Sequence, residues 1–278
     1  MTGLREYIVP SKINLGLEIL SRRPDGYHEI NTVFYRTLEP HDVITVSDAE
    51  FFRITCSDPS LVGEGNLMYR AAHRFADQFG LELPSIEVHL EKRIPMGAGL
   101  GGGSSDAATM LSILSEFSNG ISVPAELTAS IGADVPFFFT GAKAAVATGI
   151  GEQLTPIDFD LHAAVLIVLD PAIHVSTREA YAGLRLPLTP IATNFADLFD
   201  GAVDLSDLQD HLRNDFEATV FQQYPKLSSI KQSLLDRGAD LALMSGSGSA
   251  IFGLFEDVSV AEDAKRWFEA DDLLVFLS

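Results

Sequence analysis

A short glycine-rich stretch is the part of this sequence best suited to bind a phosphate. It contains Gly97, Gly99, Gly101, Gly102 and Gly103, and Ser104, Ser105 and Asp106 follow directly. Glycine lets the backbone adopt positive φ and approach a ligand closely, while serine and aspartate commonly begin helices. Apolar residues then recur at helical spacing as far as residue 117. Unpaired amides and the positive end of a helix dipole attract anions, so the stretch predicts a nucleotide phosphate site.

Two common nucleotide-binding motifs share features with this stretch but fit it poorly. Residues 97–102 match G-x-G-x-x-G, yet Pro95 interrupts the strand that a dinucleotide-binding fold requires there, and no βαβ unit surrounds it. A P-loop requires a lysine after the last glycine, where Gly103 stands instead. A third alternative is a glycine-rich linker without a ligand. Linkers seldom lead straight into a capped amphipathic helix, so we favour the anion site.

Polar residues at two other places are candidates for chemistry. Asp134 lies within the largely apolar residues 132–139, where carboxylates usually pair with a cation or take part in a reaction. The alternative is that Asp134 only caps a helix whose first turn contains Pro136. Lys12 and Asn14 alternate with apolar neighbours, which places them on one face of a predicted strand. Taken alone, these two residues are best interpreted as a solvated outer face.

The composition describes a globular protein with a strong negative charge. Its 278 residues are 46% hydrophobic and 21% charged, so the chain can bury a large core in one or two domains. The net charge of −20 argues against nucleic acid or an anionic membrane as a partner. Lys12, Lys92 and Arg93 could offset this charge at a phosphate site. A single cysteine, Cys56, and the lack of a membrane span or signal segment predict a cytoplasmic protein.

The first half of the chain predicts the elements that position these residues. Alternation predicts strands at residues 11–20 and 86–90, and a second apolar segment ends near residue 34. Asn66 precedes a helix that Gly80 ends, and residues 124–131 form another helical segment. Strands and helices follow one another without a regular βαβ order, which indicates an α+β domain with a mixed sheet over residues 1–158.

The second half, residues 159–278, predicts a ferredoxin-like domain. Its pattern includes a strand, helices and then strand, loop, strand, helix and strand. Strands are expected at residues 163–169, 241–244, 250–255 and 273–277, helices at 176–184, 204–224, 225–237 and 258–269, and loops at 187–192 and 245–249.

Three stretches considered together resemble the motifs of the galactokinase, homoserine kinase, mevalonate kinase and phosphomevalonate kinase (GHMP) superfamily. They are residues 10–15, 95–105 and 245–249. Within the superfamily, residues 23–28, 132–137, 171–177 and 180–181 resemble the branch that acts on a cytidine diphosphate-linked polyol of the non-mevalonate isoprenoid route. The resemblance implies a bacterial, two-domain α+β kinase with its active site in the cleft between the domains. The sequence leaves the oligomeric state open between a monomer and a weak homodimer.

The resemblance also implies roles for individual residues on the acceptor side. Asp134 corresponds to the catalytic base that takes the proton from the substrate hydroxyl, and Lys12 to the lysine that stabilises developing negative charge. Asn14 is expected to position the acceptor. His28 is expected to form hydrogen bonds with the cytosine, and Tyr27 and Tyr181 to stack on its two faces. Gly246 and Ser247 are further expected substrate contacts.

On the donor side, the resemblance implies that ATP is held by the glycine-rich stretch and its surroundings. The expected ATP contacts are Asn66, Lys92, Pro95, Gly97, Gly99, Leu100, Gly101, Gly102, Gly103, Ser104 and Ser105. Mg²⁺ is expected to bridge the phosphates, with Ser105 or Asp106 as its protein ligand.

The implied reaction is transfer of the γ-phosphoryl group of ATP to the 2-hydroxyl of the cytidine-linked acceptor. One alternative is a kinase of the same superfamily with another acceptor, such as mevalonate or homoserine. Another is a non-catalytic nucleotide-binding protein, although mere binding requires no base such as Asp134. Ser11 and Ser247 stand where relatives often have Ala and Thr, and residues 118–128 form a shorter segment than in some relatives.

Overall fold

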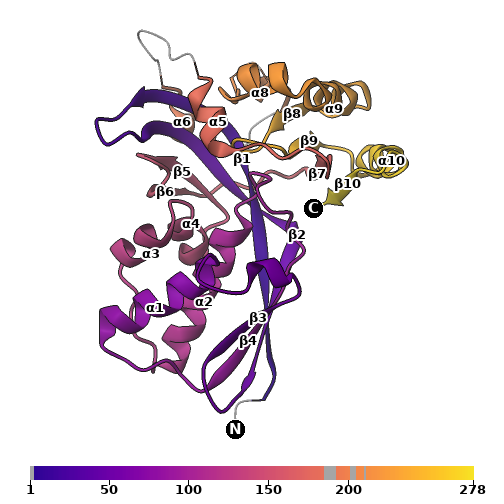
Figure 1. Ribbon diagram of the computed structural model, residues 1–278. Coiled ribbons are helices and arrows are strands. Elements are labelled where there is room, and N and C mark those ends of the chain that lie inside the picture. The colour runs from indigo at the N-terminus through magenta and orange to yellow at the C-terminus, as the bar shows by residue number, and fades with distance from the viewer. Residues whose placement is uncertain (1–2, 185–191, 201–204, 210) are drawn as a thin grey trace. The chain divides into compact units, whose positions relative to one another are not determined.

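The computed structural model describes residues 3–184, 192–200, 205–209 and 211–278 (Figure 1). The chain forms two compact units, each built from segments that are separate in the sequence. The first unit comprises Met1–Ser11, His41–Met96 and Gly101–Gly141. The second comprises Lys12–Pro40, Gly97–Leu100 and Ala142–Ser278. The domain boundary expected near residue 158 stays a prediction.

Two long strands, β1 (Arg5–Arg22) and β2 (His28–Asp48), pair with each other and run through both units. In the first unit, the last part of β2 pairs with antiparallel β4 (Ile86–Glu91), and β3 (Arg53–Cys56) lies parallel to β4 on its other side. Ile86, Val88 and Leu90 are buried while the residues between them are partly exposed, which confirms the predicted alternation.

The four helices of the first unit form one group beside β3 and β4 (Figure 1). They are α1 (Leu67–Phe79), α2 (Gly102–Phe117), α3 (Ala125–Ile131) and α4 (Val135–Thr140). The α1 boundaries are as predicted, because the Asn66 side chain accepts a hydrogen bond from the Met68 amide and Gly80 adopts φ 62°. A short 3₁₀ helix, Pro59–Leu61, precedes them.

The start of α2 differs from the sequence-based expectation. The serines and aspartate at residues 104–106 were expected to begin this helix, but it begins at Gly102. Gly101 adopts the left-handed conformation with φ 73°, and its carbonyl accepts the first helical hydrogen bond from the Ser105 amide. Because a glycine takes this conformation without strain, the turn into the helix occurs before the serines. Ser104 and Ser105 therefore lie inside the first turn of α2, and Asp106 begins the second turn.

The second unit contains the first part of β2, two short strands and a separate four-stranded sheet. Residues 32–35 of β2 pair with β5 (Ala144–Thr148), which pairs with β6 (Gln153–Ile157). The separate sheet is antiparallel throughout, and its order is β10-β7-β9-β8. Its strands are β7 (Ala164–Leu169), β8 (Leu241–Met244), β9 (Ile251–Phe255) and β10 (Leu274–Leu277). They match the predicted strands to within one residue.

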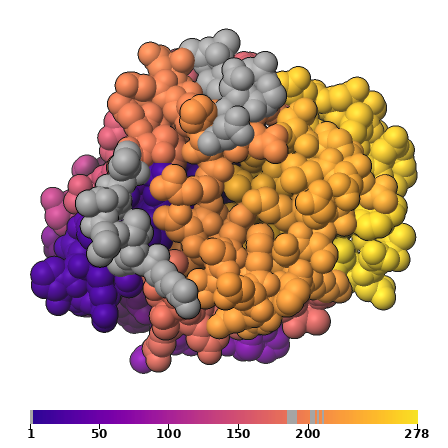
Figure 2. Space-filling view, turned by 90° about the horizontal axis from the view of Figure 1, so that it is seen from above, coloured from indigo at the N-terminus to yellow at the C-terminus, as the bar shows by residue number. Residues whose placement is uncertain are grey.

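Helices cover this sheet and complete the core of the second unit. In Figure 2, α8 (Glu217–Gln223) and α9 (Pro225–Asp236) are orange and α10 (Val258–Glu269) is yellow, and they lie together on the surface. Leu234 of α9 and Phe268 of α10 are fully or almost fully buried in one cluster with Leu166 of β7 and Phe255 of β9. The strand and helix order β7, α9, β8, β9, α10, β10 is the order predicted for a ferredoxin-like domain, with additional helices before α9.

One predicted helix of this unit is wrong as a continuous element. Residues 204–224 were expected to form a single helix, but they contain α7 (Leu205–Leu208) and α8, and Asn214 between them forms a bridge with Leu17 of β1. Pairing with a distant strand replaces the local helical hydrogen bonds there. Two short helices, α5 (Thr177–Ala182) and α6 (Phe195–Leu198), precede this region, and the loop predicted at residues 187–192 lies almost wholly outside the described residues.

Among the helices that the structure describes, none has the length and hydropathy needed to cross a membrane.

Candidate active site

The predicted site residues are distributed over both units, and each unit is considered by itself. Asp134 and the expected ATP contacts other than residues 97–100 belong to the first unit. The second unit carries Lys12 and the expected substrate contacts, together with Gly97, Gly99 and Leu100.

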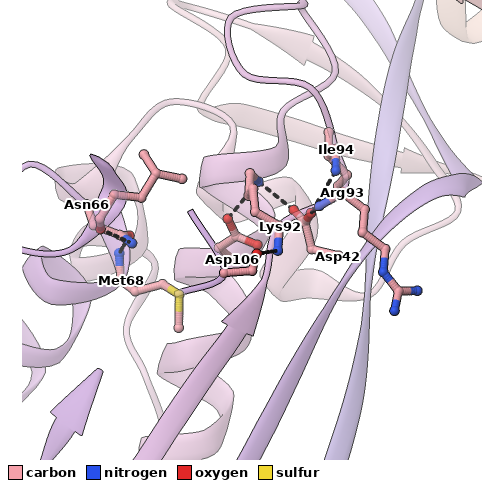
Figure 3. Close-up of polar contacts among 9 residues, drawn as sticks. Asp42, Asn66, Met68, Lys92, Arg93, Ile94 and Asp106 are labelled. Atoms are coloured by element: carbon pink, nitrogen blue, oxygen red, sulfur yellow. Dashed lines mark hydrogen bonds and ion pairs between the residues drawn. The ribbon is translucent and has the colours of Figure 1, made fainter. Parts of the chain in front are cut away.

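The first unit contains a buried ion-pair network of Lys92, Asp42 and Asp106 (Figure 3). The Lys92 ammonium contacts a carboxylate oxygen of Asp42 at 2.5 Å and one of Asp106 at 2.9 Å. The Lys92 side chain is 8% exposed, and the two aspartate side chains are 0% and 2% exposed. Charges removed from water in this way need close partners, which these three residues provide for one another.

Burial and neighbouring charges act in opposite directions on the groups of this network. Burial raises the pKa of the Asp106 carboxyl to about 7, the Lys92 ammonium opposes this rise, and the Asp42 carboxylate adds to it. Burial by itself would lower the pKa of Lys92, but Asp106 and Asp42 outweigh it and raise that pKa above its usual value. Lys92 is therefore charged at neutral pH, with its charge balanced mainly inside the protein. A contact between Lys92 and the phosphates of ATP stays a prediction.

Asp42 also fixes the backbone that leads into the glycine-rich stretch. Its second carboxylate oxygen accepts hydrogen bonds from the amides of Arg93, at 2.5 Å, and Ile94, at 2.7 Å. The Arg93 side chain points away from the two aspartates (Figure 3). Our sequence analysis did not identify Asp42, although it begins an apolar strand segment and is an isolated carboxylate like Asp134. It positions the residues immediately before Pro95.

Replacing Asp42 with alanine is expected to destabilise the protein by about 3–5 kcal/mol, because Lys92 and two backbone amides would lose a buried partner. The free energy of unfolding in urea measures this loss. The matched control is Glu116→Ala, which removes a half-exposed carboxylate that contacts Arg5 at 3.3 Å and is expected to cost less than about 1 kcal/mol. Equal losses for the two variants would show that the network contributes no more than a surface ion pair.

Close packing against this network explains why position 102 is a glycine. A Cβ atom at Gly102 would lie 2.8 Å from the Lys92 nitrogen and 2.9 Å from a methyl group of Ile94. This glycine therefore allows the first turn of α2 to pack on the ion pairs. Gly103 is exposed, and a Cβ atom there would meet only Leu67 at 3.6 Å. Of these two glycines, Gly103 is the one whose backbone a ligand could approach.

Two buried oxygens at the start of α2 could serve as ligands for a cation. Among the described residues, Ser105 Oγ and Asp106 Oδ1 are buried and have no hydrogen-bond partner. Mg²⁺ prefers oxygen ligands and usually binds one or two protein groups together with phosphates and water. Within the same described part of the chain, no group of three or more His, Cys, Asp or Glu side chains could hold a metal ion. Ser105 Oγ and Asp106 Oδ1 are the kind of oxygen ligand that Mg²⁺ prefers, so they fit such an ion.

Asp134 lies at the N-cap position of α4, but it does not act as a side-chain cap. Its side chain makes no hydrogen bond to the amides of α4, a helix described in full. The next residue, Val135, is completely buried, and Asp134 itself is partly buried. Asp134 therefore occupies the cap position, but its side chain does not make the hydrogen bond that defines a helix cap. The carboxylate lies at the N-terminus of α4 without bonding to the amides of that helix.

Lys12 and Asn14 are buried in the second unit, so their interpretation as a solvated strand face is wrong. Lys12 is 3% exposed and Asn14 is 2% exposed. The Lys12 ammonium donates to Asn14 Oδ1 at 2.6 Å and to the Gly99 carbonyl at 2.9 Å, and it lies 5.1 Å from the centre of the Phe34 ring. Alternation was correct about the shared face. It could not show that other segments cover that face.

Further hydrogen bonds connect this pair to its surroundings. Asn14 donates to the Thr32 hydroxyl at 2.9 Å, and that hydroxyl donates to the Gly16 carbonyl at 2.6 Å. The Ser245 hydroxyl donates to the Gly99 carbonyl at 2.9 Å and lies 3.4 Å from Asn14 Oδ1. The Gly99 carbonyl thus accepts from both Lys12 and Ser245. Sequence reasoning did not assign Thr32 or Ser245, although Ser245 lies in the predicted loop at residues 245–249.

Gly99 permits this close contact between distant segments. It adopts φ 78°, and a Cβ atom at this position would lie 2.0 Å from the Ser245 carbonyl oxygen. No side chain fits there. Gly97, with φ 65°, is similarly covered by the His174 ring, whose nearest atom would be 2.5 Å from a Cβ. These two glycines are required by packing within the protein and by their backbone conformation.

The residues expected to bind cytosine partly come together. The His28 and Tyr181 rings stack with centroids 4.7 Å apart and an interplanar angle of 21°, and Tyr181 packs edge-on against Phe216 at 4.8 Å. Tyr27 is 61% exposed. Burial and the Arg22 charge lower the pKa of His28, so its ring is neutral at pH 7 and can both donate and accept a hydrogen bond. The Ser247 hydroxyl lies 3.0 Å from the Thr177 hydroxyl.

Comparisons with known proteins identify the family of the chain. Residues 66–142 match the GHMP kinases N terminal domain, and residues 198–270 match the GHMP kinases C terminal domain. The chain is 44% identical over 261 residues to the 4-diphosphocytidyl-2-C-methyl-D-erythritol kinase of Solidesulfovibrio magneticus, covering 89% of this chain and 87% of the relative. It is 41% identical to the kinase of the same name from Salinibacter ruber, covering 96% of each chain. The chain belongs to the 4-diphosphocytidyl-2-C-methyl-D-erythritol kinase family.

Solved structures extend the similarity within this kinase family and beyond it. A crystal structure of 4-(cytidine 5'-diphospho)-2C-methyl-D-erythritol kinase matches with a TM-score of 0.81 and 33% identity over 98% of both chains. Homoserine kinase from Cytophaga hutchinsonii matches with a TM-score of 0.72 and 18% identity, over 100% of this chain and 94% of the other. The second likeness concerns the fold alone. Together they confirm the GHMP kinase fold that the sequence motifs predicted.

Proposed function

We propose that the chain transfers the γ-phosphoryl group of ATP to the 2-hydroxyl of 4-diphosphocytidyl-2-C-methyl-D-erythritol. Membership of the kinase family supports the reaction type. The observation that carries the proposal is the buried Lys12 ammonium, which donates to the Gly99 carbonyl and so joins β1 to the predicted phosphate loop. A buried cation at a phosphate loop suits stabilisation of the charge that develops during phosphoryl transfer.

Each proposed catalytic group has one task. Asp134 accepts the proton of the acceptor hydroxyl as it attacks the γ-phosphorus, and Lys12 stabilises negative charge on the reacting oxygens. The amides at the start of α2 bind phosphate oxygens, with Asn66 close to the nucleotide. Phosphoryl transfer depends mainly on such positioning and electrostatic stabilisation. Ser105 and Asp106 would hold Mg²⁺, which neutralises phosphate charge when bound.

The acceptor side of the proposal depends on the aromatic residues of the second unit. His28 binds the cytosine edge through its neutral ring, while Tyr27 and Tyr181 stack on the base. Asn14, Gly246 and Ser247 position the rest of the acceptor. The predictions of a cytoplasmic protein, a monomer or weak homodimer and no nucleic-acid ligand stand on the sequence alone.

An ADP-release assay with different acceptors tests the proposed function. ATP, Mg²⁺ and the chain are combined with 4-diphosphocytidyl-2-C-methyl-D-erythritol, mevalonate, homoserine or no acceptor. We expect ADP release to depend on the cytidine-bearing acceptor. Release with mevalonate or homoserine instead would identify a kinase with another acceptor. ATP binding without ADP release from any mixture would support a non-catalytic nucleotide-binding protein.

Replacing His28 with alanine is expected to raise the KM for the cytidylated acceptor by about 10–10²-fold, because stacking and hydrogen bonding to a base contribute about 1–3 kcal/mol. The KM for ATP should change little. Steady-state kinetics with each substrate varied in turn measures the difference. His89→Ala, a partly exposed histidine on β4, is the matched control and should leave both values near those of the unmodified chain. Equal increases for both substrates would contradict the assignment of His28.

A further inference from the structure

The segment Arg213 to Glu217 connects β1 with the loop at residues 245–249 inside the second unit. Its backbone pairs with β1, since the Leu17 amide donates to the Arg213 carbonyl at 2.7 Å and the Asp215 amide donates to the Leu17 carbonyl at 2.9 Å. The Asp215 carboxylate also accepts from the Ile19 amide at 2.7 Å. This part of the chain is thereby fixed to the strand that carries Lys12 and Asn14.

Asn214 extends from this segment to the loop through its side chain. Its amide nitrogen donates to the carbonyls of Met244 and Gly246, both at 2.7 Å. Its amide oxygen accepts from the Phe216 amide at 3.0 Å. Asn214 is 4% exposed, so both of its donor positions are used in a buried setting. Glu217 adds a hydrogen bond from the Met244 amide at 2.8 Å.

The two carbonyls that Asn214 holds flank Ser245. The Ser245 hydroxyl in turn donates to the Gly99 carbonyl, which is also the acceptor for the Lys12 ammonium. A shift of the loop would therefore move Ser245 away from Gly99. The Gly99 carbonyl, which accepts from Lys12, would then lose the hydrogen bond from Ser245 that helps to fix its position. Asn214 is thus connected to the predicted catalytic lysine through the loop backbone, Ser245 and Gly99.

The same segment also supports the aromatic residues. Phe216, whose amide binds Asn214, packs edge-on against Tyr181 with an interplanar angle of 89°. Tyr181 stacks on His28. One short segment thus contacts the strand of Lys12, the loop of Gly246 and Ser247, and the pair expected to bind cytosine.

We infer that Asn214 is a positioning residue that holds the 245–249 loop against Gly99 and so sets the place of the acceptor. The inference deepens the proposed function and rests on it for the identity of the acceptor. The hydrogen bonds themselves do not depend on that identity. Their effect on the loop can therefore be measured separately from activity.

Two substitutions separate positioning from folding. Asn214→Asp keeps the shape and the acceptor for the Phe216 amide but loses both donors, so carboxylate oxygens face two carbonyls. Asn214→Ala removes all three hydrogen bonds. The matched control is Asn31→Ala, because Asn31 is 5% exposed and donates from its amide nitrogen to Glu18 and to the Thr193 carbonyl, both at 2.9 Å. The Asn31→Ala variant loses the same number of donated hydrogen bonds, and neither of them is made to the 245–249 loop.

Hydrogen exchange measured by mass spectrometry reports on the loop directly. Both Asn214 variants should increase deuterium uptake in peptides covering residues 244–250, where the Ala250 amide donates to Ala98 and the Gly248 amide to Ser245. Asn31→Ala should leave uptake there unchanged, even if it lowers Tm by a similar amount. Unchanged uptake in both Asn214 variants would overturn the inference.

Kinetics supplies the second readout. In the Asn214 variants we expect kcat/KM for the acceptor to fall by roughly 10–10²-fold, the loss typical of a misplaced reacting group, with a smaller change in the KM for ATP. The inference fails if Asn31→Ala, at a Tm similar to that of the Asn214 variants, lowers kcat/KM for the acceptor as much as they do. Asn214 would then have only a structural role. If the unmodified chain does not phosphorylate the cytidine-linked acceptor, the proposed function fails, while the exchange experiment still decides the role of Asn214 in the loop.

Discussion

Replacing Asp134 with asparagine is expected to lower kcat by about 10²–10⁴-fold, the usual contribution of a general base. Asparagine keeps the size of the side chain but cannot accept the proton of the acceptor hydroxyl. Because asparagine is nearly isosteric with aspartate, Tm is measured alongside kcat to separate a loss of the base from a loss of stability. Single-turnover measurement of ADP formation at saturating substrates gives the rate of the chemical step.

A true helix cap provides the opposite control. Asp257 accepts hydrogen bonds from the amide of Ser259, at 2.8 Å, and from its hydroxyl, and it caps α10. Asp257→Ala should therefore lower Tm through loss of the cap and leave kcat unchanged. An unchanged kcat in Asp134→Asn, or a loss explained by a lower Tm, would remove Asp134 from the role of base.

Replacing Lys12 with methionine is expected to lower kcat by about 10²–10³-fold, because a preorganised charge at the reacting oxygens would be lost. Methionine matches the length of the lysine stem and suits a buried position next to Phe34. The Gly99 carbonyl would keep its hydrogen bond from Ser245, so the loop should stay in place. Lys12→Arg should not restore activity, since a planar guanidinium cannot replace a compact ammonium in a buried site.

Two comparisons make the Lys12 result decisive. Lys143→Met removes a half-exposed lysine that pairs with Asp160, and kcat should stay unchanged in this control. In the double variant Lys12→Met, Asp134→Asn, the combined loss of kcat should be smaller than the product of the two single losses, because residues that act on one step are not additive. A normal kcat in Lys12→Met, or fully additive losses, would contradict joint action of the two residues.

The sequence predicted many local elements correctly because their causes lie within a few residues. The N-cap Asn66 and the terminal Gly80 define α1 by hydrogen bonds and dihedral angles inside that helix. The alternation in β4 follows directly from the geometry of a strand. Motif order along the chain was enough to indicate the GHMP superfamily, since short motifs retain the residues that bind and react.

The two errors have different causes, one a distant strand and the other a turn made earlier in the chain. A helix was expected across Asn214, but its pairing with Leu17 of β1 interrupts the helical pattern. The helix-starting residues near Ser105 did not mark the start of α2, because Gly101 makes the turn earlier. Local propensity is a weak influence that such contacts readily overcome.

By itself, the sequence determined the family and the main strands and helices, and it supplied the candidate site residues as predictions. Only the tertiary structure showed that Lys12 and Asn14 are buried, that Asp42 holds Lys92, and that Ser245 meets Gly99. The physical reason is that burial and hydrogen-bond partners depend on which segments meet in space. Asp42 and Lys92 are separated by 50 residues, and Ser245 and Gly99 by 146. No local pattern in the sequence encodes these contacts, and they give the predicted site residues their positions.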